Sequence, residues 1–108
     1  MIFEDFQKFI EEQHQFFRKL KKQTKNDRIF ARTIKLGEEY GELCDAVLAS
    51  VGDQRKGKLV KGKPGDLEEE FADVLIVLFM LAKAMDVDVM KATNGKVAKI
   101  RKRHGKQV

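Results

Sequence analysis

The segment LEEEFADVLIVLFMLA, residues 67–82, decides the fold class of this chain. Its apolar part is interrupted only by Asp73, and Lys83 is the next charged residue. The apolar run from Phe71 to Met85 is about 15 residues long, which is short of the ~20 residues that a helix needs to cross a bilayer. We therefore expect a helix over about 66–85 that is buried in a protein core and not in a membrane.

The remainder of the chain also favours helices. Apolar residues spaced by threes and fours predict a helix over about 2–22 and another over about 29–51. The segment 52–65 contains four of the eight glycines and the only proline, which predicts a flexible, basic loop. A last helix is expected over about 87–103, followed by a frayed tail over 104–108.

The length and composition indicate one globular domain. A chain of 108 residues is long enough for one modest core, and its 43% hydrophobic and 36% charged residues are typical of a soluble protein. We therefore predict a single all-α domain over 1–108, a four-helix bundle. The apolar stripes expected to form its core are Ile2, Phe6, Phe9, Ile10, Phe16, Phe17 and Leu20 in the first helix, and Leu36, Tyr40, Leu43 and Val47 in the second.

Charge and cysteine content limit the partners and the compartment. The net charge of +5 is compatible with nucleotides, nucleic acids and anionic membranes, and does not choose among them. The single cysteine, Cys44, cannot form an internal disulfide, which fits a reducing compartment. The segment 1–5 lacks the basic start of a signal peptide. We expect a cytoplasmic protein without a membrane partner.

Two pairs of acidic residues lie on the second and third predicted helices. The pairs are Glu39 with Glu42, and Glu70 with Asp73. Residues three apart share one face of a helix, so two adjacent helices would bring four carboxylates to one centre. Hard cations such as Mg²⁺ and Mn²⁺ prefer such ligands, whereas the alternative is a set of solvated surface acids. Asp73 favours the metal site, because its apolar neighbours predict burial and a buried carboxylate needs a partner.

The acidic residues form two motifs, Glu38-Glu39-x-x-Glu42 and Glu70-x-x-Asp73. These motifs, within KLGEEYGELCDAVL and LEEEFADVLIVLFMLA, resemble the signature of the MazG-like all-α nucleoside triphosphate pyrophosphohydrolases. The resemblance covers about residues 28–103. It implies Mg²⁺-dependent hydrolysis of a (d)NTP between its α and β phosphates, giving a monophosphate and pyrophosphate, with house-cleaning of the nucleotide pool as the expected task.

The resemblance also implies roles for individual residues. The implied Mg²⁺ ligands, with Mn²⁺ as a substitute ion, are Glu39, Glu42, Glu70 and Asp73. Glu38 matches either an additional ligand or the group that orients the attacking water, so Glu38 and Glu39 are the expected catalytic residues. The expected phosphate-binding residues are Lys91, Asn94, Lys96 and Lys99, for which a solvated basic face is the alternative. The loop lysines that could close over a phosphate tail, or simply be solvated, are Lys56, Lys58, Lys61 and Lys63.

Family members are usually dimers, or tetramers made of two dimers. We therefore expect a homodimer or homotetramer in which a neighbouring subunit completes the nucleotide cleft, because four helices leave little wall around a nucleotide. The chain has no tryptophan to stack a base. The aromatic residues that could replace it, or belong to the core, are Phe16, Phe17, Phe30 and Tyr40. His14 and His104 lack the spacing of metal ligands.

Three other functions remain open. A phosphoribosyl-ATP pyrophosphohydrolase would share the fold and the acidic motif, but the stretch Asn94-x-Lys96-x-x-Lys99 fits it less well. A nucleic-acid-binding module would use the basic last helix and leave the acidic pairs without a role, so we do not expect nucleic acid as a partner. A helical interaction protein would use the aromatic stripe of the first helix for docking.

Overall fold

The computed structural model describes residues 2–52 and 66–105, and these residues form four helices. The helices are α1 (Phe3–Leu20), α2 (Lys25–Ser50), α4 (Leu67–Ala84) and α5 (Val89–Arg103). The all-α prediction is confirmed. Most of the predicted basic loop and the last three residues of the predicted tail lie outside the described residues, and so do the loop lysines Lys56, Lys58, Lys61 and Lys63.

Short polar side chains set the starts of three helices. Helix α2 begins four residues earlier than predicted, because Thr24 Oγ1 accepts a hydrogen bond from the backbone of Asp27 at 3.0 Å. Asp66 and Asp88 cap α4 and α5 in the same way, with donor–acceptor distances of 2.9 and 3.0 Å. Gly52 follows the end of α2 with φ of 76°, a left-handed conformation that glycine adopts without strain.

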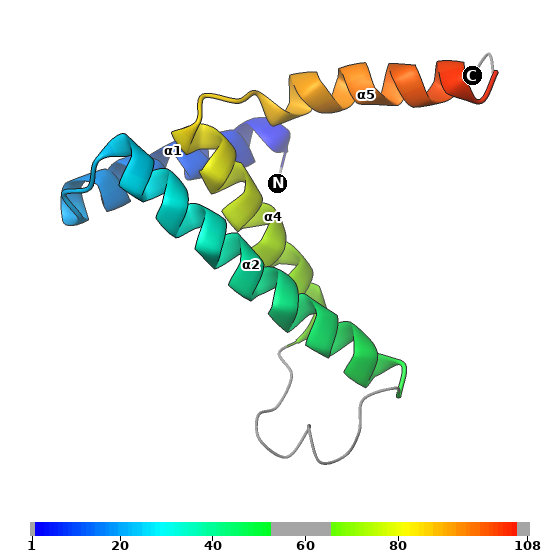
Figure 1. The fold of residues 1–108 in the computed structure, drawn as a ribbon, viewed down its shortest axis with the longest axis horizontal. Helices are drawn as coiled ribbons and strands as arrows, with labels where there is room; N and C mark the ends of the chain where they lie inside the picture. The colour runs from blue at the N-terminus through cyan, green and yellow to red at the C-terminus, as the bar shows by residue number, and fades with distance from the viewer. Residues whose placement is uncertain (1, 53–65, 106–108) are drawn as a thin grey trace.

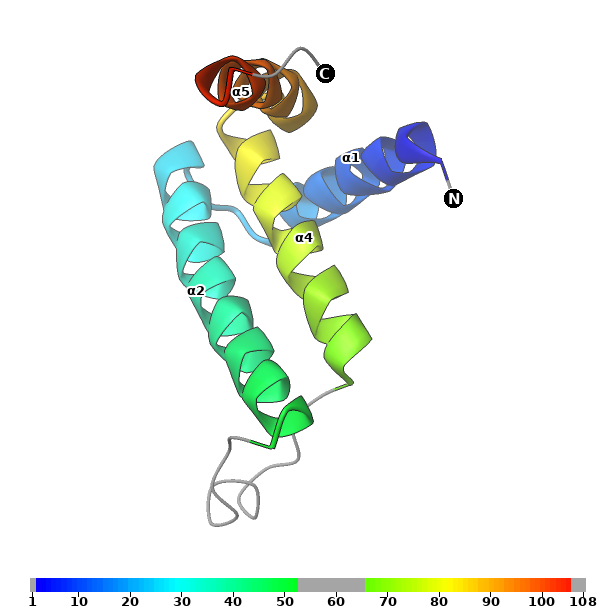
Figure 2. The same cartoon turned by 90° about the vertical axis from the view of Figure 1, so that its right-hand side faces the viewer.

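Helices α2 and α4 lie side by side and run antiparallel, and α1 crosses the C-terminal half of α4 (Figures 1 and 2). The small core lies at this crossing. Phe6 and Ile10 of α1 pack against Met80 of α4, and the rings of Phe6 and Phe79 meet edge to face with centroids 5.0 Å apart. These apolar contacts fix α1 on α4.

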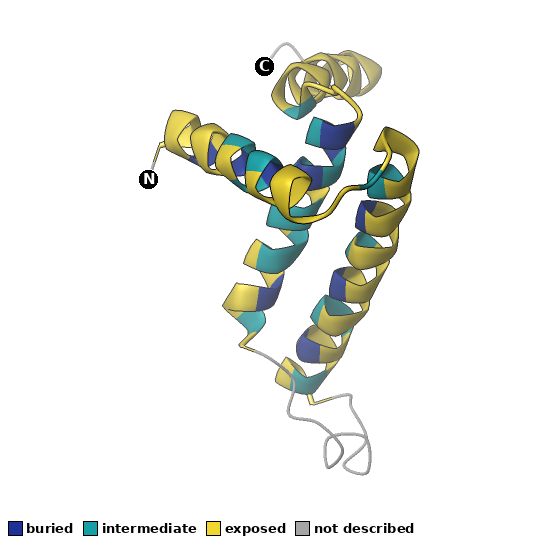
Figure 3. Ribbon diagram, turned by 90° about the vertical axis from the view of Figure 1, so that its left-hand side faces the viewer, coloured by how far each residue is buried: buried dark blue, intermediate teal, exposed yellow. Residues whose placement is uncertain are grey.

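The buried face of α2 differs from the predicted stripe (Figure 3). Tyr40 is 61% exposed and Val47 is also exposed, so their prediction as core residues is wrong for a single chain. The buried residues of α2 are instead Arg32, Glu39 and Ala46, which are spaced by seven and share one face. Periodicity identified an apolar stripe, but α4, the main neighbour of α2 among the described residues, lies against a different face.

Helix α5 projects away from the other helices, and none of its residues is buried (Figure 1). The radius of gyration is 17.2 Å, whereas a compact domain of this length has about 13 Å. Large apolar side chains such as Phe30, Ile34, Phe71 and Leu75 are exposed. In the part of the chain that is described, no helix is both long and apolar enough to span a bilayer.

Candidate metal centre

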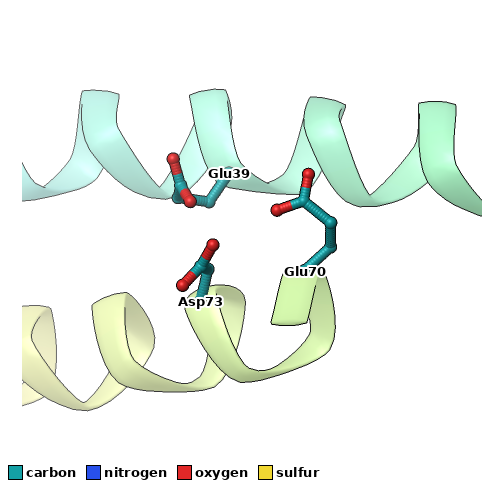
Figure 4. Close-up of side chains that lie close together, drawn as sticks. All are labelled: Glu39, Glu70 and Asp73. Atoms are coloured by element: carbon teal, nitrogen blue, oxygen red, sulfur yellow. The ribbon is translucent and has the colours of Figure 1, made fainter. Parts of the chain in front are cut away.

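Three carboxylates meet between α2 and α4. Glu39 extends from α2, while Glu70 and Asp73 extend from the first turns of α4 toward it (Figure 4). One oxygen from each of the three side chains lies within 4.8 Å of the other two. The i, i+3 spacing on α4 places its two acids on one face, and the antiparallel pairing of the helices places Glu39 opposite them.

The burial of these acids is unequal. Glu39 and Glu70 are both only 7% exposed, whereas Asp73 is not buried. The expectation that Asp73 is buried is therefore wrong. The apolar residues further along α4, such as Ile76 and Phe79, pack against α1, whereas Asp73 lies before that contact and faces α2 (Figure 4).

The cluster brings negative charges close together, and one lysine contacts it. Burial raises the pKa of the Glu70 carboxyl. The charge of Glu42, a hydrogen bond from the protonated Glu70 carboxyl to Asp73, and the charges of Asp73 and Glu39 raise this pKa further. Lys35 Nζ lies 3.4 Å from Glu39 Oε2, and this contact raises the pKa of Lys35. Among the described residues, the ion pairs include no Lys or Arg partner for Glu70 or Asp73.

The other two predicted acids lie beside this cluster. Glu42 is exposed and is not one of the three converging residues, although its charge acts on Glu70. Glu38 is exposed, and one of its oxygens lies 3.9 Å from Lys35 Nζ. A ligand role for Glu42 and a catalytic role for Glu38 both stay predictions.

The predicted phosphate-binding residues of α5 are not near the cluster in the same chain. All four, Lys91, Asn94, Lys96 and Lys99, are exposed. Helix α5 follows the C-terminal end of α4, and Glu70 is separated from that end by about 21 Å of helix at 1.5 Å per residue. These residues could reach a metal centre only if it belonged to another copy of the chain.

The converging carboxylates fit a divalent cation. Mg²⁺ holds oxygen ligands at about 2.1 Å, so two oxygens on opposite sides of one ion lie about 4.2 Å apart. Neighbouring oxygens around such an ion lie about 3 Å apart, so the three carboxylates, whose oxygens are within 4.8 Å of one another, must draw together to hold one ion. Such an ion would replace the missing counter-charge of Glu70 and Asp73, which solvent alone supplies poorly to a buried group.

A pocket of about 400 Å³ lies next to the cluster, between α1, α2 and α4. Its wall is mainly apolar, with cations at several points. The lining residues that matter here are Phe17, Ala31, Ile76, Val77 and Met80 among the apolar ones, and Lys21, Arg28, Arg32 and Lys35 among the cations. Lys35 contacts Glu39 of the cluster, and Glu38 contacts Lys35 and precedes Glu39 along α2. These two residues therefore connect the pocket to the cluster.

The sequence reasoning missed a buried polar pair in this region. Arg32 and His14 are 8% and 9% exposed, and Arg32 Nη1 lies 3.0 Å from His14 Nδ1. His14 was expected only to lack a ligand role. The usable signal was spacing, because Arg32 precedes Glu39 by seven residues and therefore lies on the same face of α2.

Comparison with known families agrees with the acidic motifs. The model of the MazG nucleotide pyrophosphohydrolase domain matches residues 31–108, which is more than two thirds of the chain and contains all three converging acids. No curated protein and no solved structure matches the chain. The family match rests on the segment from α2 to α5, and it shows that the chain belongs to the MazG nucleotide pyrophosphohydrolase family.

Proposed function

We propose that this chain is a Mg²⁺-dependent pyrophosphohydrolase that cleaves a (d)NTP into a (d)NMP and pyrophosphate and so helps to clean the nucleotide pool. The observation that carries the proposal is the convergence of Glu39, Glu70 and Asp73 inside the segment that the family model matches. Carboxylates in this arrangement suit the Mg²⁺ that accompanies a triphosphate.

The reaction needs a cation, a proton acceptor and groups that hold the phosphates. Glu39, Glu70 and Asp73 would hold Mg²⁺, which would neutralise phosphate oxygens and make the attacking water more acidic. Water adds to phosphorus as the α–β bridging bond breaks, and pyrophosphate leaves with the bond electrons. The exposed carboxylate of Glu38, beside the cluster, is the group we assign to accept the proton of that water.

The phosphates also need cations from beyond the cluster. Lys35 is one, because it contacts Glu39 and lines the neighbouring pocket. We assign the others to α5 of a second copy, since α5 carries six basic and no acidic residues and all of its residues after Val89 are exposed. Its positive charge complements the acidic residues of α2 and α4 in and around the cluster.

A second copy would also cover the apolar surface that one chain leaves open. An apolar groove of about 480 Å³ lies between α1 and α4, lined by residues that include Phe3, Phe9 and Leu75. Exposed apolar surface of this kind is typical of protein interfaces. We therefore propose a homodimer, or a tetramer of dimers, in which each copy completes the site of the other.

The test is pyrophosphate release from a panel of NTPs and dNTPs with Mg²⁺, comparing the wild type with Asp73→Asn and Asp45→Asn. Asp45 is an exposed acid of α2 outside the cluster and serves as the matched control. We expect release by the wild type and the control and none by Asp73→Asn. Pyrophosphate release from phosphoribosyl-ATP but from no NTP or dNTP would support the rival phosphoribosyl-ATP pyrophosphohydrolase activity. The proposal fails if no nucleotide is cleaved, or if Asp73→Asn remains fully active.

A further inference from the structure

Arg32 is a buried cation whose hydrogen bonds are incomplete. Its side chain crosses from α2 toward α4, where Nη1 donates to the backbone oxygen of Met80 at 2.7 Å. The same nitrogen lies 3.0 Å from His14 Nδ1, which accepts if the imidazole carries its hydrogen on Nε2. Nη2 is buried and has no hydrogen-bond partner within the described part of the protein.

This arrangement is unfavourable without a further partner. A guanidinium carries only donors, and a buried donor without an acceptor forfeits the hydrogen bonds it had with water. Burial lowers the pKa of Arg32, and the charge of Arg28 lowers it further. In residues 2–52 and 66–105, no carboxylate forms an ion pair with it. The bonds to Met80 and His14 hold the side chain in place but leave the second nitrogen unused.

Arg32 belongs to the wall of the 400 Å³ pocket described above. That volume lies within the range of small-molecule sites, and the mainly apolar lining suits a flat, weakly hydrated group such as a nucleobase. Phe17 and Met80 contribute a ring and a thioether against which a base can lie. The charged phosphates would point the other way, past Lys35, toward the carboxylate cluster.

We infer that this pocket binds the base of the nucleotide and that the Arg32 guanidinium selects bases with a carbonyl, and not an amino group, at purine position 6 or pyrimidine position 4. This inference rests on the proposed function for the identity of the ligand. Nη2 is closed to solvent in this structure, so the side chains that cover it must move aside for a base to reach it. A carbonyl oxygen would then accept a hydrogen bond from Nη2, whereas an amino group would place a second donor against it. Hypoxanthine, guanine, uracil and thymine have the carbonyl, while adenine and cytosine have the amino group.

The ligands compared are dIMP with dAMP, and dUMP with dCMP. The members of each pair differ only in the carbonyl or amino group at purine position 6 or pyrimidine position 4, and in whether the adjacent ring nitrogen carries a hydrogen. Their dissociation constants are measured by calorimetry in EDTA, which removes catalysis from the comparison. We expect the carbonyl member of each pair to bind about tenfold or more tightly, the factor typical when a charged donor keeps its acceptor. The corresponding kcat/KM ratio of dITP to dATP with Mg²⁺ should favour dITP in the same direction.

The variant is Arg32→Lys, which keeps the charge and a nitrogen for Met80 but loses the second arm of the fork. For this variant, the ratio of the two dissociation constants within each ligand pair should fall close to one. The control is Arg28→Lys, a change in another arginine of the same pocket, whose Nη2 already donates to the backbone oxygen of Gln23 at 3.1 Å. That variant should retain the preference even if its overall affinity falls.

Equal binding of dIMP and dAMP, and of dUMP and dCMP, by the wild type overturns the inference, whatever the hydrolase assay gives. Equal loss of preference in both arginine variants also overturns it, because the effect would then be one of general charge. If Arg32→Lys does not fold, the wild-type pairs decide. Preferential binding of dIMP and dUMP without cleavage of any triphosphate would support the pocket and refute the proposed hydrolase.

Discussion

Replacement of Asp73 by asparagine should remove the stabilisation of this protein by Mg²⁺ while leaving its fold intact. The two side chains have nearly the same shape, and Asp73 is not buried, so packing changes little. The cluster falls from three carboxylates to two, which we expect to weaken Mg²⁺ binding at least tenfold. Without Mg²⁺ the variant should melt no lower than the wild type, because one of the charges that raise the pKa of Glu70 is gone.

The size of the effect follows from mass action. With Mg²⁺ at ten times its wild-type dissociation constant, binding to the folded state adds about 1.4 kcal/mol to the free energy of unfolding. For a chain of about this size, that raises the melting temperature by about 6–11 °C. A tenfold weaker site adds only about 0.4 kcal/mol, or about 2–3 °C.

The assay is thermal unfolding followed by circular dichroism at one protein concentration, across a Mg²⁺ titration, with Asp45→Asn as control. The control should respond as the wild type does, because Asp45 lies outside the cluster. Equal responses of the wild type and Asp73→Asn would refute the metal site, since the ion would then act elsewhere. An unresponsive wild type would show that these acids are structural or merely solvated.

Three further results are expected. Burial, and then the charge of Arg32, lower the pKa of His14 below the ordinary 6.5. The free energy of unfolding that neutral His14 contributes is therefore present above pH 6.5 and is lost as the pH falls through the folded-state pKa. Urea midpoints measured across this pH range should fall with pH for the wild type and change less for His14→Gln. Lys35→Met should tighten Mg²⁺ binding, measured by calorimetry, because Glu39 loses a competing cation, yet raise KM for the nucleotide. Phe6→Ala should lower the free energy of unfolding by about 3 kcal/mol or more in urea titrations, because the ring fills the α1–α4 contact; a change below 1 kcal/mol would contradict that packing.

The sequence predicted the helices well and their arrangement less well. Apolar spacing placed four helices, because a 3.6-residue repeat is a local property of the chain. It could not tell which apolar stripe has a neighbour within the same chain. Tyr40 and Val47 lie on a real stripe that α4 does not cover, and no residue of α5 is buried.

The candidate site was likewise predicted in part. Two acidic motifs with i, i+3 spacing predicted which faces carry carboxylates, and Glu39, Glu70 and Asp73 do converge. The burial of each acid depends on how the helices pack, and here the apolar surroundings of Asp73 along the sequence were misleading. Arg32 was missed because a lone arginine on a helix normally extends into solvent, and its contact with His14 joins residues 18 positions apart.

The separation of α5 from the cluster within one chain leads to a test by complementation. If α5 of one copy serves the metal centre of another, Asp73→Asn and Lys96→Ala should each be inactive alone but active when mixed. A mixed dimer would contain one site with both defects and one with neither. Because half of the dimers are mixed after exchange at equal amounts, about a quarter of wild-type activity should return. If α5 served its own chain, every site in a mixed dimer would keep one defect, and mixing would restore nothing.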